Sequence, residues 1–100
     1  MPLPEIIEVD PRTLHVPPSR PQGADPGKVA RQILRFGIST AGMPLLQVIR
    51  GKDGKLRIND GVPRATRVAK LLPGQVRVEV FQESPRLDVA RFPTLGETLP

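Results

Sequence analysis

Cysteine, tryptophan and tyrosine are absent from this chain of 100 residues. The absence of cysteine excludes a disulfide framework, a thiol nucleophile and a cysteine-based zinc site. It leaves the redox compartment open, because a chain without thiols works equally well on either side of a membrane. Aromatic residues are limited to Phe36, Phe81 and Phe92, so the core must be built from Val, Ile and Leu.

The chain also lacks long apolar segments. No apolar run approaches the roughly 20 residues that a membrane-spanning helix needs. The start, Met1-Pro2-Leu3-Pro4-Glu5, has neither the basic nor the apolar region of a signal peptide. We therefore expect a cytoplasmic protein with no membrane partner. Export would require another route or a larger parent chain.

Charge of one sign predominates. The sequence has 15 Lys and Arg against 10 Asp and Glu, a net charge of +5. Such a balance favours anionic partners, which are nucleotides, nucleic acids or acidic proteins. Many small domains are mildly basic without any such partner, so charge alone does not decide the function.

The first half of the chain predicts a strand, a helix and a hairpin. Residues 6–9 form a short apolar run, and residues 26–36 carry apolar residues at helical spacing. Asp25 suits the N-cap of that helix and Gly37 the position after its end. Residues 45–50 and 56–59 predict two strands, joined by a turn at 51–54.

The second half predicts a helix from about Pro63 to Leu72, followed by an alternating strand over residues 75–81. Residues 84–100 have no clear period, so we expect a tail or an edge strand over 87–92. One domain is therefore predicted over residues 1–83, with 84–100 as its appendage. The fold class expected is α+β, a small mixed β-sheet with helices on one face.

The most informative stretch is Asp60-Gly61-Val62-Pro63-Arg64, where a strand meets a helix through a glycine turn. A helix N-terminus offers unpaired N–H groups and the positive end of a dipole, so it suits phosphate. Gly61 lets the backbone approach a ligand. Arg64 and Arg67 can add forked hydrogen bonds to phosphate oxygens. The alternative is structural, with Asp60 as the helix cap and both arginines solvated.

The order of these elements and this turn resemble the N-terminal domain of the ParB/sulfiredoxin superfamily. ParB proteins read Gly-Glu-Arg-Arg at the turn and sulfiredoxins Gly-Cys-His-Arg, where this chain reads Gly61-Val62-Pro63-Arg64. The resemblance covers roughly residues 5–82. It implies binding of a nucleoside triphosphate, ATP or CTP, by Gly61, Val62 and Arg64. Arg67 supports them, and Arg20 falls where ParB proteins carry an arginine before their first helix.

The departures from the family restrict its functions. Val62 stands where sulfiredoxins have their reactive cysteine, so that reductase chemistry is excluded. The chain also has no second nucleotide motif and no helix-turn-helix, so DNA-binding of the centromere type is not expected. A looser similarity links residues 59–67 to ParB-like modules of secreted polymorphic toxins. That similarity implies a nuclease or NTP-hydrolysing toxin domain, delivered or secreted with its parent chain.

Two further residues have alternative interpretations. Asp60 is either the helix cap or a ligand of Mg²⁺ that bridges to a nucleotide. His15 is the only histidine, and its place in a Pro-rich segment favours an incidental role over a catalytic one. No residue is identified as a nucleophile or general base. The hypotheses are therefore a nucleotide-binding domain, a hydrolysing toxin domain and a non-catalytic protein-interaction domain.

Overall fold

The computed structural model describes residues 2–99 and has the element order that the sequence predicts, with a 3-10 turn added after the first strand and two short helical elements added after the last strand. The elements are β1 (Glu5–Val9), the 3-10 turn η1 (Pro11–Thr13), α1 (Pro26–Phe36), β2 (Leu46–Arg50), β3 (Leu56–Asp60), α2 (Val62–Leu71), β4 (Val76–Glu83), the 3-10 turn η2 (Val89–Arg91) and α3 (Leu95–Thr98).

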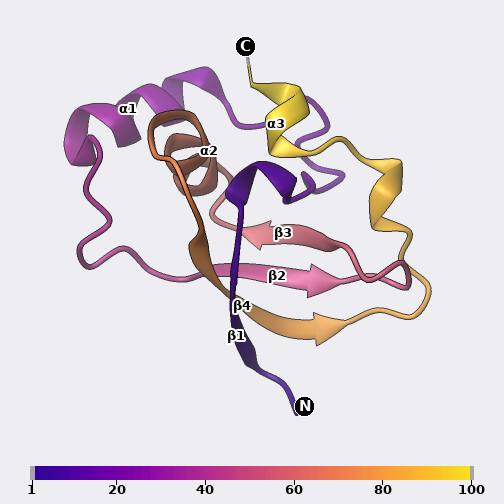
Figure 1. Cartoon of the computed structure of the whole chain (residues 1–100). Helices are drawn as coiled ribbons and strands as arrows, with labels where there is room; N and C mark the ends of the chain where they lie inside the picture. Colours follow the sequence, from indigo (N-terminus) through magenta and orange to yellow (C-terminus); the bar gives the residue numbers. More distant parts are fainter. Residues whose placement is uncertain (1, 100) are drawn as a thin grey trace.

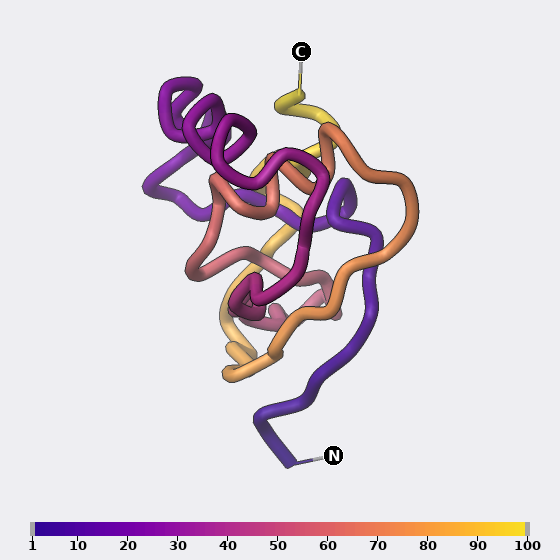
Figure 2. Tube along the Cα trace, turned by 90° about the vertical axis from the view of Figure 1, so that its left-hand side faces the viewer, coloured from indigo at the N-terminus to yellow at the C-terminus, as the bar shows by residue number. Residues whose placement is uncertain are grey.

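The four strands form one mixed sheet in the order β1-β4-β2-β3. Strand β4 pairs antiparallel with β1 and parallel with β2, while β2 and β3 form the antiparallel hairpin. In Figures 1 and 2 helices α1, α2 and α3 gather on the same side of β2, β3 and β4. The expected α+β class with a small mixed sheet is confirmed.

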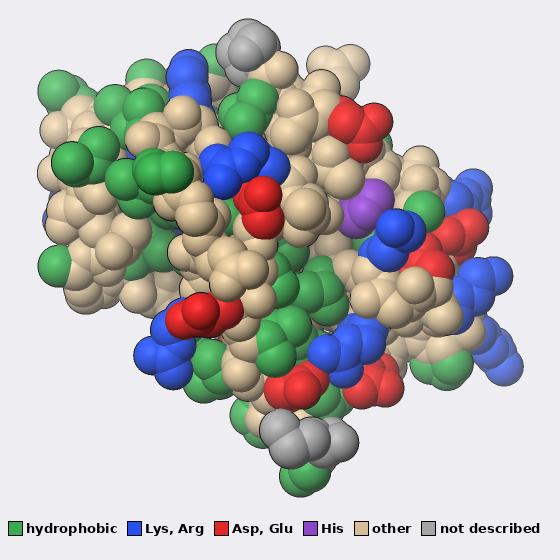
Figure 3. All heavy atoms as spheres, viewed as in Figure 1, with side chains coloured by type: hydrophobic (Ala, Val, Ile, Leu, Met, Phe, Trp, Pro, Cys, Tyr) green, Lys and Arg blue, Asp and Glu red, His purple; other side chains and the backbone are tan. Residues whose placement is uncertain are grey.

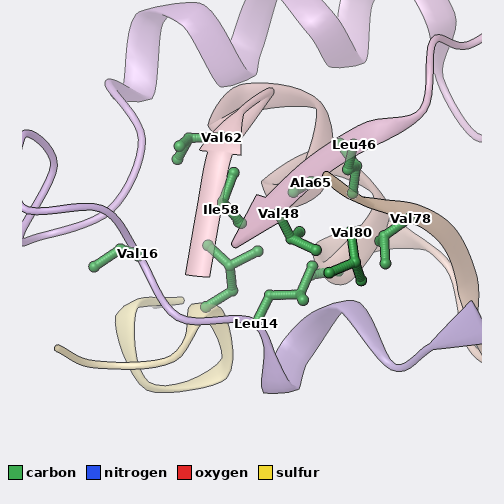
Figure 4. Packing of buried hydrophobic residues seen from close by; sticks show 11 residues of the cluster. Leu14, Val16, Leu46, Val48, Ile58, Val62, Ala65, Val78 and Val80 are labelled. Atoms are coloured by element: carbon green, nitrogen blue, oxygen red, sulfur yellow. The ribbon is translucent and has the colours of Figure 1, made fainter. Parts of the chain in front are cut away.

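The core lies between the sheet and α2. Val78 and Val80 of β4 are fully buried, as the alternation in the sequence predicts. They pack with Leu46, Val48 and Ile58 of the neighbouring strands and with Ala65 and Ala69 of α2, as the close-up shows for most of them (Figure 4). Small alanines on α2 let that helix approach the strands closely.

The ends of α1 follow directly from local chemistry. The Asp25 carboxylate accepts a hydrogen bond of 2.8 Å from the Gly27 N–H, and Pro26 occupies the first turn. Gly37 ends the helix with φ of +54° and donates its N–H to the Ile33 carbonyl. A glycine is favoured there because other residues rarely adopt a positive φ.

The C-terminal segment differs from the expected tail or edge strand. None of residues 84–99 joins the sheet as a strand; they form η2 and the single turn of α3. Val89 and Leu95 are fully buried, and Leu95 belongs to the main core cluster. The sequence of this segment shows no helical or strand periodicity, because only isolated side chains of it are buried in the core.

Two polar residues near β1 tie distant segments together. The Arg12 guanidinium donates to the Ala69 and Leu72 carbonyls at 2.8 and 3.0 Å, which satisfies the C-terminal end of α2. The His15 ring is buried, and its Nδ1 lies 2.6 Å from the Phe92 carbonyl oxygen. Within the described part of the chain, no helix is long and apolar enough to cross a membrane.

Candidate functional site

The turn between β3 and α2 leaves the start of the helix open. Gly61 is the N-cap of α2, with φ of +99°, and no side chain caps the helix. The first intrahelical bond runs from the Ala65 N–H to the Gly61 carbonyl at 2.8 Å. The N–H groups of the first turn have no intrahelical acceptor, although Pro63 contributes none. Val62 and Arg64 therefore have backbone N–H groups without an intrahelical acceptor at this helix end.

Gly61 is required by both conformation and space. A β-carbon at this position would lie 2.7 Å from Nη2 of Arg64 and 2.9 Å from Cδ2 of Leu46. Its φ of +99° is also strained for any residue with a side chain. The guanidinium of Arg64 is thus folded against the turn itself rather than extended into solvent.

A shallow groove of about 180 Å³ opens beside the turn. Three segments form it: the loop before α1, the first turn of α1, and the β3–α2 turn. Four of the predicted site residues, Arg20, Asp60, Gly61 and Val62, line this one groove. The complete lining is Pro17, Ser19, Arg20, Ala24, Asp25, Lys28, Asn59, Asp60, Gly61, Val62 and Pro63.

Sequence reasoning missed two charged residues of the groove. Asp25 was predicted only as the N-cap of α1, yet both Asp25 and Lys28 border the groove beside Gly61. Neither residue type nor spacing predicts this position, because the loop over 17–25 must fold back before Asp25 and Lys28 come close to the Gly61 turn. Arg20 and Lys28 therefore bring positive charge from two segments to the N-terminus of α2.

Asp60 does not cap α2, which corrects the structural alternative given above. Its carboxylate, with 68% of the side chain exposed, lies 3.6 Å from Nη2 of Arg64. The Nε of Arg64 is buried and has no hydrogen-bond partner. Arg64 therefore lies against the turn but outside the lining of the groove, and it lines a second pocket together with Phe36 and Arg67.

Arg67 occupies a different place from the one that the sequence indicated. The sequence predicted either a phosphate contact or a solvated side chain, but only 1% of Arg67 is exposed. Its Nη1 donates to the Gly37 and Ser39 carbonyls at 2.7 and 2.9 Å. Its Nη2 lies 3.5 Å from the Met43 sulfur, and Cζ lies 5.4 Å from the Phe36 ring centre. Arg67 therefore holds the loop between α1 and β2.

The groove offers carboxylates but no preformed metal cluster. Across residues 2–99, no group of three or more His, Cys, Asp or Glu side chains could hold a metal ion. Asp25 and Asp60 both line the groove. Mg²⁺ at nucleotide sites commonly uses one or two carboxylates and takes its other ligands from phosphate and water, so this donor set fits that ion.

No protein-family model, curated protein or solved structure matched this chain. The ParB/sulfiredoxin resemblance rests on the turn residues and on the order of the elements.

Proposed function

We propose that this chain is a nucleotide-binding module of the ParB/sulfiredoxin type that holds the phosphates of ATP or CTP at the Gly61 turn. The observation that carries the proposal is the groove beside that turn, where Arg20 and Lys28 border the open N-terminus of α2. A helix N-terminus with two cations from other segments favours an anion with several charges. Arg64, folded over the turn, adds a further donor.

The size of the groove limits which part of a nucleotide it holds. Its volume of about 180 Å³ is below the roughly 300–1,000 Å³ of pockets that enclose a drug-sized ligand. It therefore accommodates phosphate groups, while the sugar and base lie outside it. We expect recognition to be dominated by phosphate, with modest discrimination between bases.

Mg²⁺ is expected to bind together with the phosphates. Asp25 and Asp60 would repel a bare phosphate group in the same groove. A divalent cation held by these carboxylates would supply charge neutralisation and a link to the phosphate oxygens. Binding should therefore be weak in EDTA and strengthened by Mg²⁺.

The test is calorimetric titration of the native protein with ATP, CTP and inorganic tripolyphosphate, each with Mg²⁺ or EDTA. Arg64→Ala and Arg20→Ala should each weaken binding by tenfold or more, since a charge-assisted hydrogen bond contributes about 1.5–3 kcal/mol. Arg86→Ala is the matched control, because it removes the same charge from an exposed position outside the groove. Equal binding by Arg64→Ala and the native protein would contradict the proposal.

The same samples test the hydrolysing-toxin alternative. The assays are phosphate release from ATP or CTP and cleavage of nucleic acid. Activity in either assay that depends on Mg²⁺ and is lost in Asp60→Asn would show that the chain is an enzyme. Binding without turnover would keep it as a binding module.

A further inference from the structure

The end of α1 exposes large apolar side chains that the fold does not use. Leu34 is 89% exposed, Ile38 71% and Phe36 40%. These are three of the five large hydrophobic residues that are exposed among residues 2–99, and they lie within five positions of one another. We call Leu34, Phe36 and Ile38 the apolar ridge. Figure 3 shows hydrophobic side chains gathered over this end of the molecule. Exposed apolar clusters of this kind mark interaction surfaces.

The surroundings of the apolar ridge are positively charged. Helix α1 carries Lys28, Arg31 and Arg35, and the sequence has no Asp or Glu from residue 26 to residue 52. Arg31 and Arg35 take part in none of the ion pairs found within residues 2–99. Arg35 instead lies over the Phe36 ring, 5.2 Å from its centre. A second copy of this chain would bring like charges together, so charge favours an acidic partner.

Phe36, one residue of the apolar ridge, also lines a pocket of about 230 Å³. Its lining contains no carboxylate and consists of Gln32, Phe36, Ser39, Ala41, Gly42, Met43, Pro44, Arg64 and Arg67. Arg67 is buried there without a counter-charge, and two N–H donors of the lining, Arg64 Nε and Arg67 Nε, are buried without a hydrogen-bond partner. Gln32 Oε1 is also unpaired, but it is an acceptor and would not bind a carboxylate. A buried cation is costly unless it is paired. The pocket therefore suits a carboxylate carried on a short side chain.

We propose that the apolar ridge and this pocket form a docking surface for an acidic segment of a partner protein. The segment carries an Asp or Glu that enters the pocket toward Arg67, next to aliphatic or aromatic side chains that cover Leu34 and Ile38. Arg31 and Arg35 face further acidic residues of the segment. A protein segment is favoured over an anionic membrane because the ridge has only three apolar side chains. A membrane-surface helix carries a continuous apolar face.

This docking surface is separate from the phosphate groove, which lies beside Arg20, Lys28 and Gly61. Loss of nucleotide binding would leave it intact. Only Arg64 lies close to both the turn and the pocket, so it is not used in the test.

The test is selection of a displayed library of random 12-residue peptides on the native protein, followed by fluorescence polarisation with the selected peptides. Enrichment of Asp or Glu beside Leu, Ile, Phe or Trp is expected. Leu34→Gln combined with Ile38→Gln should weaken binding at least tenfold, and Ala41→Trp should do the same by blocking the pocket. The control is Ile6→Gln, an exposed apolar residue on β1, which should leave the affinity unchanged. Melting temperatures confirm that each variant is folded.

Several outcomes would overturn the proposal. One is selection of peptides without acidic residues, and another is equal affinity for the native protein and the Leu34/Ile38 double variant. If the native protein binds no peptide but sediments with phosphatidylserine vesicles, and the double variant does not, the partner is a membrane surface instead. Self-association that is lost in the double variant would identify a second copy as the occupant. Affinity that falls as salt rises is the further result expected of a charged partner.

Discussion

Replacement of Arg67 by Met should destabilise the domain strongly, although Arg67 lies only one helical turn from the Gly61 turn and Arg64. The guanidinium donates to the Gly37 and Ser39 carbonyls at 2.7 and 2.9 Å and is 1% exposed. Each hydrogen bond from a charged donor contributes about 1.5–3 kcal/mol. Ser39 is exposed, so its carbonyl regains water in the variant, and the lower value applies. The two bonds together give a loss of about 3 kcal/mol.

Urea denaturation at constant pH measures this loss as a shift in the midpoint without a change in slope. A thermal scan should show a decrease in Tm of about 12–24 °C, at about 4–8 °C per kcal/mol for a domain of this size. Lys70→Met is the matched control, since Lys70 is exposed on the same helix and its loss should change stability by less than about 0.5 kcal/mol. Arg67→Lys should recover part of the loss. If Arg67→Met were as stable as Lys70→Met, the reasoning about Arg67 would be refuted.

Three further predictions concern other parts of the fold. Gly61→Ala should lower the free energy of unfolding in urea by at least about 1–2 kcal/mol, because φ is +99° and the new methyl group meets Leu46; unchanged stability would exclude a left-handed turn. Leu95→Ala should cost about 2–5 kcal/mol in the same assay, as Leu95 is fully buried, whereas a detached tail would tolerate it. Hydrogen bonds from the Thr94 backbone and hydroxyl lower the pKa of Glu97. Its contribution to stability is therefore complete above its unfolded pKa of about 4.3 and is lost as pH falls through the lower folded pKa. Thr94 and Glu97 form a capping box at the start of α3, in which each side chain accepts from the other's backbone N–H. Glu97→Gln should make the acid limb of the stability profile shallower, and an unchanged limb would show that this capping box does not titrate with folding.

Local features of the sequence predicted the helices and strands whose ends are marked by capping residues, proline or glycine. Asp25, Pro26 and Gly37 delimit α1, because capping and a positive φ depend only on neighbouring residues. The alternation of Val76, Val78 and Val80 predicted a half-buried strand, and the structure places Val78 and Val80 in the core. The Gly61 turn was also predicted from residue types, since only glycine readily adopts the conformation that starts α2.

Contacts between distant segments were not predictable in this way. Arg67 and Lys70 carry the same charge and lie on the same helix, but Arg67 is buried and Lys70 is exposed. The difference comes from the loop over 37–43, whose carbonyls reach Arg67 only after α1 has packed on α2. Leu95 likewise belongs to a segment without a period, and its burial depends on Leu14, whose carbonyl accepts the Leu95 N–H at 2.8 Å.

The phosphate groove combines both kinds of information. The sequence by itself determined the turn and the basic balance of the chain, because each depends on residue type and immediate spacing. The structure decided that Asp60 leaves the N-terminus of α2 uncapped. Tertiary structure alone decided that Asp25 and Lys28 meet that turn. Tertiary structure also decided that Arg67 is buried and that Leu34 and Ile38 are exposed to solvent. The burial of a side chain depends on the surfaces that pack against it, and those surfaces meet only when distant segments of the chain have folded together.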